Sequence, residues 1–243
     1  MSVAAHTPHK LVRSALAPEQ YFRWRAGEIT RLEAFCDVVF GFAITLLVVS
    51  LEVPKNFSEL LTALRGFVPF AACFGQVVMI WLYHYKFSRR YGLQDGWTIF
   101  LNIVLLFLVL FYVYPLKFVF SALFDEVRGV EAAMLTFHEG SVLMRVYGIG
   151  FAAVFGLFAL MHWHAYNWRV PLELNEVEVF ATRISILESS GLMMIGVVSC
   201  IIAFWAPQWA GFTFFLIGPF LAVSGSVMGK KLRLLAGKTQ ALD

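Results

Sequence analysis

Six long apolar stretches, separated by short polar segments, dominate the chain. The hydrocarbon core of a bilayer is about 30 Å thick, and a helix that rises about 1.5 Å per residue needs roughly 20 residues to cross it. Each stretch meets this length. We therefore predict an all-α polytopic membrane protein with six transmembrane helices, at about residues 32–53, 60–85, 97–123, 146–163, 184–205 and 209–228.

The composition agrees with a membrane protein and argues against a soluble one. Hydrophobic residues make up 60% of the chain and charged residues 14%, whereas a soluble domain has about 45–50% and about 25%. The 25 Phe, 7 Trp and 8 Tyr suit a lipid-facing surface with aromatic residues at its edges. No nucleophile elbow, metalloprotease motif or glycine-rich phosphate loop is present, so we expect neither an enzyme nor a nucleic-acid-binding protein.

The three cysteines, Cys36, Cys73 and Cys200, lie singly inside apolar stretches. No Cys-x-x-Cys pair or Cys/His spacing accompanies them, so neither a disulfide nor a zinc site is expected. The expected partner is the lipid bilayer, and we expect no cofactor and no bound metal other than a permeant ion.

The basic residues gather at one end of the predicted spans. If the N-terminus is inside, 14 of the 19 Lys and Arg residues fall in cytoplasmic segments. The positive-inside rule then places both termini in the cytoplasm. The N-terminal residues lack the apolar region and cleavage site of a secretory signal. These features favour the cell membrane of a bacterium, that is, its inner membrane.

The spans divide the chain into a cytoplasmic N-terminal segment (1–30), a transmembrane domain (31–229) and a basic cytoplasmic tail (230–243). No strong internal repeat is visible, so the chain gives no support to an inverted-repeat transporter.

Two segments outside the spans have an amphipathic character. Residues 10–30 mix apolar and aromatic residues with basic ones and predict an interfacial amphipathic helix. The external loop 124–145 predicts a covering segment at the membrane surface.

Within the last span, Gly225 and Gly229 have the spacing that allows close helix contact.

The first span carries an ionisable residue, Asp37, inside an apolar stretch. A carboxylate at the centre of a membrane helix costs about 2.5–3.5 kcal/mol, so it needs a buried partner or water. At about 100° per residue, Asp37 points about 140° away from Phe42. If the apolar stripe faces a symmetry axis, the carboxylate therefore faces neighbouring helices. The stripe around Phe42 contains Val38, Phe42, Leu46, Val49 and Val53, with Thr45 at its edge.

Polar motifs in the first three spans resemble a known family. The first span begins Arg31-Leu-Glu-Ala-Phe35-Cys36-Asp37, the second ends in Trp81-Leu-Tyr-His84, and the third holds Asn102 followed by Pro115. These residues are similar to the Arg-x-x-x-Phe-Ser-Asp, Trp-x-x-His and Asn…Pro motifs of the bacterial transmembrane protein 175 family, with Cys36 in place of the serine. The resemblance covers about residues 28–230.

This resemblance implies a potassium-permeable cation channel without the Thr-Val-Gly-Tyr-Gly carbonyl filter, a pentapeptide that the sequence lacks. It also implies a homotetramer whose first helices surround a central pore, with rings of apolar side chains as the constriction. The matching positions are Phe42, where the family has Ile or Leu, Thr45 and Val49, and Leu46 lies on the same stripe. Because phenylalanine is bulkier than isoleucine, we hypothesise a hydrophobic gate at Phe42.

The remaining signature residues are interpreted as a network that ties helices together. We expect Arg31, Asp37 and His84 to form hydrogen bonds between the first two spans, with a titrating His84 as the functional alternative. Asn102 is expected to bridge helices. Glu188 is expected to pair with Arg183 or to line the inner mouth. The full set is Arg31, Phe35, Asp37, Trp81, His84 and Asn102.

Two other functions remain open at this point. A proton-coupled secondary transporter would use Asp37, His84 and Glu188 as a relay, although transporters place such groups beside broken helices and the first span is apolar and unbroken at its middle. A non-conducting membrane scaffold would result if Phe42 sealed the axis.

Overall fold

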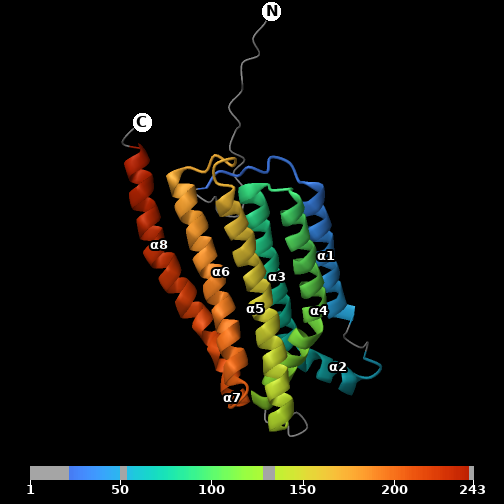
Figure 1. The fold of residues 1–243 in the computed structure, drawn as a ribbon. Coiled ribbons are helices and arrows are strands. Elements are labelled where there is room, and N and C mark those ends of the chain that lie inside the picture. Colours follow the sequence, from blue (N-terminus) through green and yellow to red (C-terminus); the bar gives the residue numbers. More distant parts are fainter. Residues whose placement is uncertain (1–21, 50–53, 128–134, 241–243) are drawn as a thin grey trace, which may run out of the picture.

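The computed structural model describes residues 22–49, 54–127 and 135–240, and these residues form helices without any strand. Six segments of this described part are long and apolar enough to cross a membrane, which confirms the prediction of an all-α chain with six spans. The long helices stand side by side in one bundle (Figure 1), and they are α1 (Arg31–Val49), α3 (Phe67–Tyr91), α4 (Gly96–Val127), α5 (Phe137–Asn167), α6 (Glu176–Ile202) and α8 (Ile217–Gln240).

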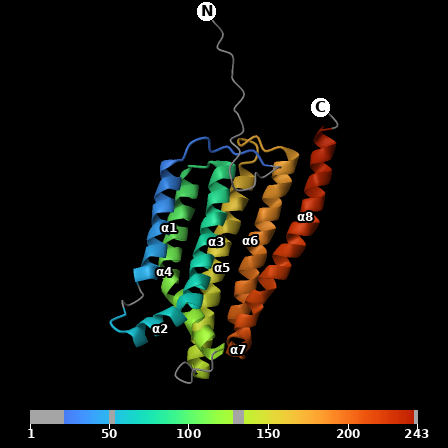
Figure 2. The same cartoon turned by 180° about the vertical axis from the view of Figure 1, so that it is seen from behind.

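Three short elements complete the described chain: α2 (Phe57–Arg65), α7 (Pro207–Ala210) and the 3-10 helix η2 (Gly211–Leu216). α1 and α8 occupy opposite edges of the bundle in both views (Figures 1 and 2). The start of α1 and the end of α8 lie at the same end, which we call the terminal end. The opposite end is the distal end.

The second predicted span is divided in two. The apolar run from residue 60 to 85 predicts one helix, but Gly66 separates α2 from α3. Pro69 lies in the first turn of α3, where its missing N–H costs no hydrogen bond. α2 projects sideways from the distal end of the bundle (Figures 1 and 2), with Phe57, Leu61 and Leu64 exposed.

The two predicted surface segments also differ from expectation. Of the amphipathic helix predicted over residues 10–30, residues 1–21 lie outside the described residues, and 22–30 are not helical. In the predicted external loop 124–145, α4 continues to Val127 and α5 already begins at Phe137, while residues 128–134 lie outside the described part. In the predicted basic tail, α8 continues to Gln240.

Capping boxes start both helices of the α5–α6 pair. Thr136 caps α5 and accepts a hydrogen bond from the Glu139 backbone, while the Glu139 side chain accepts one from the Thr136 backbone. Asn175 and Glu178 form the same reciprocal pair at the start of α6. Each box satisfies backbone N–H groups that have no partner inside the helix.

An aromatic core holds the centre of the bundle together. The rings of Phe151 and Phe155 on α5 are 4.6 Å apart, and Tyr147 on α5 meets Phe214 on η2 at 4.7 Å. Tyr83 on α3 packs edge-on against Phe155 at 5.5 Å. Aromatic pairs at these distances add about 0.5–1.5 kcal/mol beyond the area that they bury.

Asp95 stabilises the start of α4 from the loop that precedes it. Its carboxylate accepts hydrogen bonds from the backbone N–H groups of Trp97 and Thr98 and from the Thr98 hydroxyl, and it lies 3.0 Å from Nε2 of His164 on α5. Burial raises the pKa of the Asp95 carboxyl, but the hydrogen bonds from Thr98 and His164 outweigh this effect and hold the pKa below its ordinary value.

A depressed carboxyl pKa links this cap to acid stability. Because the folded pKa is lower than the unfolded one, the carboxylate stabilises the protein above about pH 4 and loses this effect as the pH falls through the folded pKa. Asp95→Asn keeps a good helix cap but removes the charge. We expect its Tm to be a few degrees below that of the wild type at pH 7, with the difference shrinking towards pH 3. Thermal unfolding in detergent measures this, with Glu176→Gln on the exposed surface of α6 as a control that also removes one carboxylate.

Candidate pore-lining helix

The helix α1 buries one face against its own chain. Its buried residues recur every three or four positions, so they form a single stripe, and this stripe packs against α3 and α4. The residues of the stripe are Glu33, Cys36, Phe40, Ala43 and Leu47.

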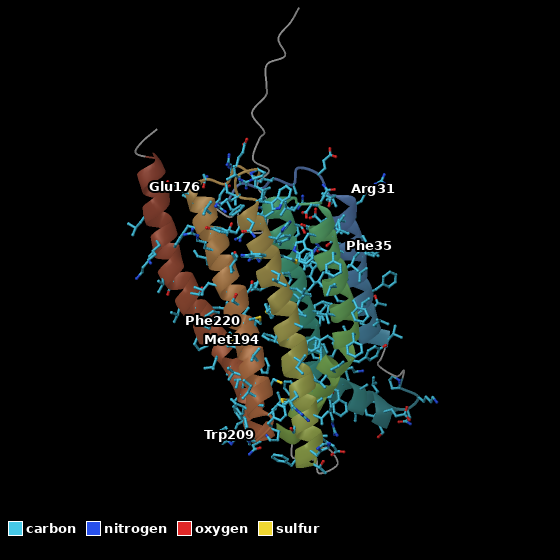
Figure 3. All side chains as sticks on the ribbon, in the orientation of Figure 1. Arg31, Phe35, Glu176, Met194, Trp209 and Phe220 are labelled. Atoms are coloured by element: carbon cyan, nitrogen blue, oxygen red, sulfur yellow. The ribbon has the colours of Figure 1, made fainter. Side chains whose placement is uncertain are left out.

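The opposite face of α1 is exposed and largely apolar. Phe42 is 62% exposed and Val49 71% exposed, and neither is covered by any other part of the described chain. Arg31 and Phe35 lie at the free edge of the bundle that α1 forms (Figure 3). The large apolar side chains of this exposed face are Phe35, Val38, Phe42, Leu46, Val48 and Val49.

Thr45 lies within the exposed face and not at its edge. Around the helix, Leu46 is exposed on one side of Thr45, and Gly41 and Val48 are exposed on the other side. The sequence placed Thr45 at the edge of the stripe. Its hydroxyl donates a hydrogen bond to the Gly41 carbonyl oxygen at 2.9 Å. The bond uses the only hydroxyl proton, so lone pairs of the oxygen remain available on the exposed side.

Asp37 is half-buried at the border between the exposed face and the buried stripe, about 140° from Phe42 as helical geometry predicts. The Nε1 of Trp81 on α3 donates a hydrogen bond to its Oδ1 at 2.8 Å. A hydrogen bond to a charged acceptor is stronger than one between neutral groups. The carboxylate therefore has a fixed partner between α1 and α3.

Asn102 joins three helices. Its Oδ1 lies 2.7 Å from Nε2 of His84 on α3 and accepts a longer contact from the Cys36 thiol on α1 at 3.8 Å. Its Nδ2 donates to the Thr98 carbonyl oxygen within α4. Since the amide oxygen can only accept, His84 donates through Nε2. Cys36 thus keeps a weaker form of the bond that a serine hydroxyl would make.

The predicted network is therefore rearranged. Asp37 and His84 have separate partners, Trp81 and Asn102. Arg31 is exposed and takes part in no hydrogen bond or ion pair among the described residues, and Phe35 is exposed beside it.

A different ion pair holds the start of α1. Glu33 is buried in the first turn, and its Oε1 lies 3.3 Å from Nε of Arg89 at the end of α3. Sequence reasoning missed this pair. The only signals for it were an acidic residue inside the first-span motif and a basic residue that ends the second span.

Glu188 on α6 belongs to another part of the bundle. Glu188 accepts a hydrogen bond from the Ser224 hydroxyl on α8 at 2.6 Å, whereas Arg183 binds the Tyr166 hydroxyl. The expected pairing of Glu188 with Arg183 is therefore wrong. Within the described ranges, no group of three or more His, Cys, Asp or Glu residues is arranged to hold a metal ion.

Known proteins are similar to this chain in sequence and in fold. A potassium channel of Marivirga tractuosa is 38% identical over an alignment that covers 93% of this chain and 98% of that protein. The crystal structure of a variant of the potassium channel MtTMEM175, bound to a nanobody fusion protein, superimposes with a TM-score of 0.76 at 37% identity over 88% of this chain and 99% of that one.

A second, more distant structure has a similar fold. The lysosomal potassium-selective channel TMEM175 homologue from Chamaesiphon minutus matches with a TM-score of 0.56 at 24% identity, over 80% of this chain and 96% of that chain. The family described as endosomal/lysosomal potassium channel TMEM175 matches residues 31–112, from the start of α1 into α4.

The six span-length helices make the chain an integral membrane protein, and its similarity to potassium channels over nearly its whole length places it in the ion-channel class rather than among enzymes. The chain belongs to the TMEM175 family of potassium channels.

Proposed function

We propose that this chain is one subunit of a homotetrameric, potassium-permeable cation channel whose pore is lined by four copies of α1. The observation that carries the proposal is the exposed apolar face of α1 with Thr45 inside it. The similarity to proteins named potassium channels supports it. The absent Thr-Val-Gly-Tyr-Gly pentapeptide means that a carbonyl filter of that kind does not provide the selectivity.

The constriction is proposed to consist of Phe42, Thr45, Leu46 and Val49. On a helix, residues three or four positions apart lie one above the other, so Phe42, Leu46 and Val49 supply successive apolar rings. Thr45 supplies a ring of hydroxyl oxygens, and its donor is already satisfied within α1. A cation that passes this level would meet oxygen lone pairs in an otherwise apolar passage.

Both termini are proposed to lie in the cytoplasm of a bacterial cell, with the channel in its inner membrane. The terminal end carries basic residues at the starts and ends of helices, including Arg31, Arg89 and Arg90. An excess of lysine and arginine is typical of the cytoplasmic side. The bacterial origin of the relatives agrees with this location.

The side-chain contacts give the carrier alternative no support. Asp37, His84 and Glu188 bind Trp81, Asn102 and Ser224 respectively, and not one another. A scaffold without ion flux differs from the channel only in conduction, so the same experiment separates the two.

Ion flux in proteoliposomes tests the proposal. We expect potassium to run down its gradient without a coupling ion, at a rate well above that of empty liposomes, and we would repeat the assay with sodium to obtain the selectivity. A rate equal to that of empty liposomes, with the protein shown to be folded, would favour the scaffold. A flux that requires a proton gradient would favour the carrier.

A further inference from the structure

Residues 22–30, here called the strap, cross the terminal end of the bundle before α1 begins (Figure 1). The strap has no regular secondary structure, yet it starts over α6 and ends at the first residue of α1. It therefore connects one of the helices farthest from α1 in the bundle to the proposed pore helix.

The α6 end of the strap is held by one carboxylate. Glu178 is completely buried, and its oxygens accept hydrogen bonds from the Arg23 backbone N–H at 2.8 Å and from Nη2 of Arg25 at 2.7 Å. The two guanidinium groups also donate to the carbonyl oxygens of Glu173 and Leu172, at 2.8 and 2.7 Å. A buried carboxylate with two arginine partners is costly to leave unpaired, so this anchor is specific.

The middle of the strap is held by the end of α3. The Arg25 backbone N–H donates to the Arg89 carbonyl oxygen at 3.1 Å, and Phe22 packs edge-on against Tyr91 at 5.4 Å. Gly92 ends α3 with a φ of 59°, and a Cβ there would lie 3.4 Å from the Ala26 nitrogen. A glycine at this point lets the strap pass close over the helix end.

The short segment between the strap contacts and α1 leaves the start of α1 little freedom to move. Four residues separate Ala26 from Arg31, and this length spans no more than about 17 Å even when fully extended. The side chain of Arg89, whose carbonyl oxygen holds the strap, also pairs with Glu33 in the first turn of α1. The start of α1 is thus tied to the same group of contacts as the start of α6.

We infer that Glu178 is a positioning residue for the pore helix: by holding Arg23 and Arg25 it fixes the strap, and through the strap the place and tilt at which α1 starts. This positioning requires no contact between Glu178 and the permeating ion. The inference rests on the proposed function, because it treats α1 as the helix that lines the pore.

The test compares Glu178→Gln with Glu176→Gln, which lies on the exposed surface of the same helical turn. Hydrogen–deuterium exchange of the peptides over residues 22–36 reports the strap and the start of α1, and potassium flux in proteoliposomes reports the pore. For Glu178→Gln we expect exchange in these peptides to be about tenfold faster, since local opening becomes easier, and the potassium leak to rise several-fold because α1 is no longer held. Glu176→Gln is expected to match the wild type in both measurements.

A milder variant keeps the test informative if Glu178→Gln does not fold. The Arg23 side chain is 60% exposed, and Arg25 still holds the carboxylate in Arg23→Ala, so we expect smaller changes in the same directions. Unchanged exchange, or faster exchange with unchanged flux, would overturn the positioning role while the conducting wild type still upholds the channel. Absence of flux in the wild type itself would instead reject the proposed function and the inference with it.

Discussion

Replacing Phe42 with alanine is expected to raise the potassium flux of the reconstituted protein about tenfold, which corresponds to a barrier lowered by about 1.4 kcal/mol. Phe42 is the bulkiest side chain in the middle of the exposed face of α1. In the proposed tetramer four phenyl rings meet at this level. An apolar ring closes a pore by expelling water from it, so removal of the rings should let water and ions pass.

Two variants define what the Phe42 result means. Phe107 on α4 is 67% exposed and lies outside the proposed pore, so Phe107→Ala removes the same group from another apolar surface and should leave flux unchanged. Phe42→Leu keeps a branched apolar side chain at this level and should keep flux closer to that of the wild type. A Phe42→Ala protein that conducts like the wild type would exclude a gate at this residue.

Replacing Gly196 with alanine is expected to destabilise the bundle by about 1–3 kcal/mol, the usual cost of an extra methyl group in a tightly packed interior. A Cβ at Gly196 on α6 would lie 2.8 Å from the Gly148 carbonyl oxygen and 2.9 Å from the Ala152 nitrogen, both backbone atoms of α5. Neither atom can rotate away, so the two helices must separate. The expected result is a lower Tm in detergent, or loss of folded protein.

Gly225→Ala is the matched control for the Gly196 variant. No atom lies within 4 Å of a Cβ built on Gly225 in the middle of α8, and alanine is favoured over glycine inside a helix by about 1 kcal/mol. We expect this variant to be at least as stable as the wild type. Equal stability of Gly196→Ala and Gly225→Ala would mean that the α5–α6 contact is looser than the structure indicates.

The glycines illustrate where sequence reasoning fails. Spacing alone drew attention to Gly225 and Gly229, yet both face open space within the described chain. The close approach is made instead by Gly148 and Gly196, which lie in different helices and share no local pattern. A short motif within one helix cannot reveal which partner helix it meets, because that depends on how the helices are arranged.

The hydrogen-bond partner of Asp37 shows the same limit of sequence reasoning. Helical geometry correctly placed Asp37 about 140° from Phe42, because a period of about 3.6 residues is a property of the helix itself. The choice between Trp81 and His84 as its partner was beyond that argument. The two candidates lie one turn apart on α3, and the relative height of α1 and α3 decides which of them reaches the carboxylate.

By itself, the sequence determined the all-α class, the six spans and the two faces of α1. These follow from the thickness of the bilayer and the period of the helix, which act on each segment separately. Only the tertiary structure decided that the run over 60–85 breaks at Gly66, that Glu33 pairs with Arg89, and that the strap is anchored on Glu178. The reason is physical: a buried charge takes the partner that packing brings within hydrogen-bonding distance, and Arg25 and Glu178 are separated by 153 positions in the chain.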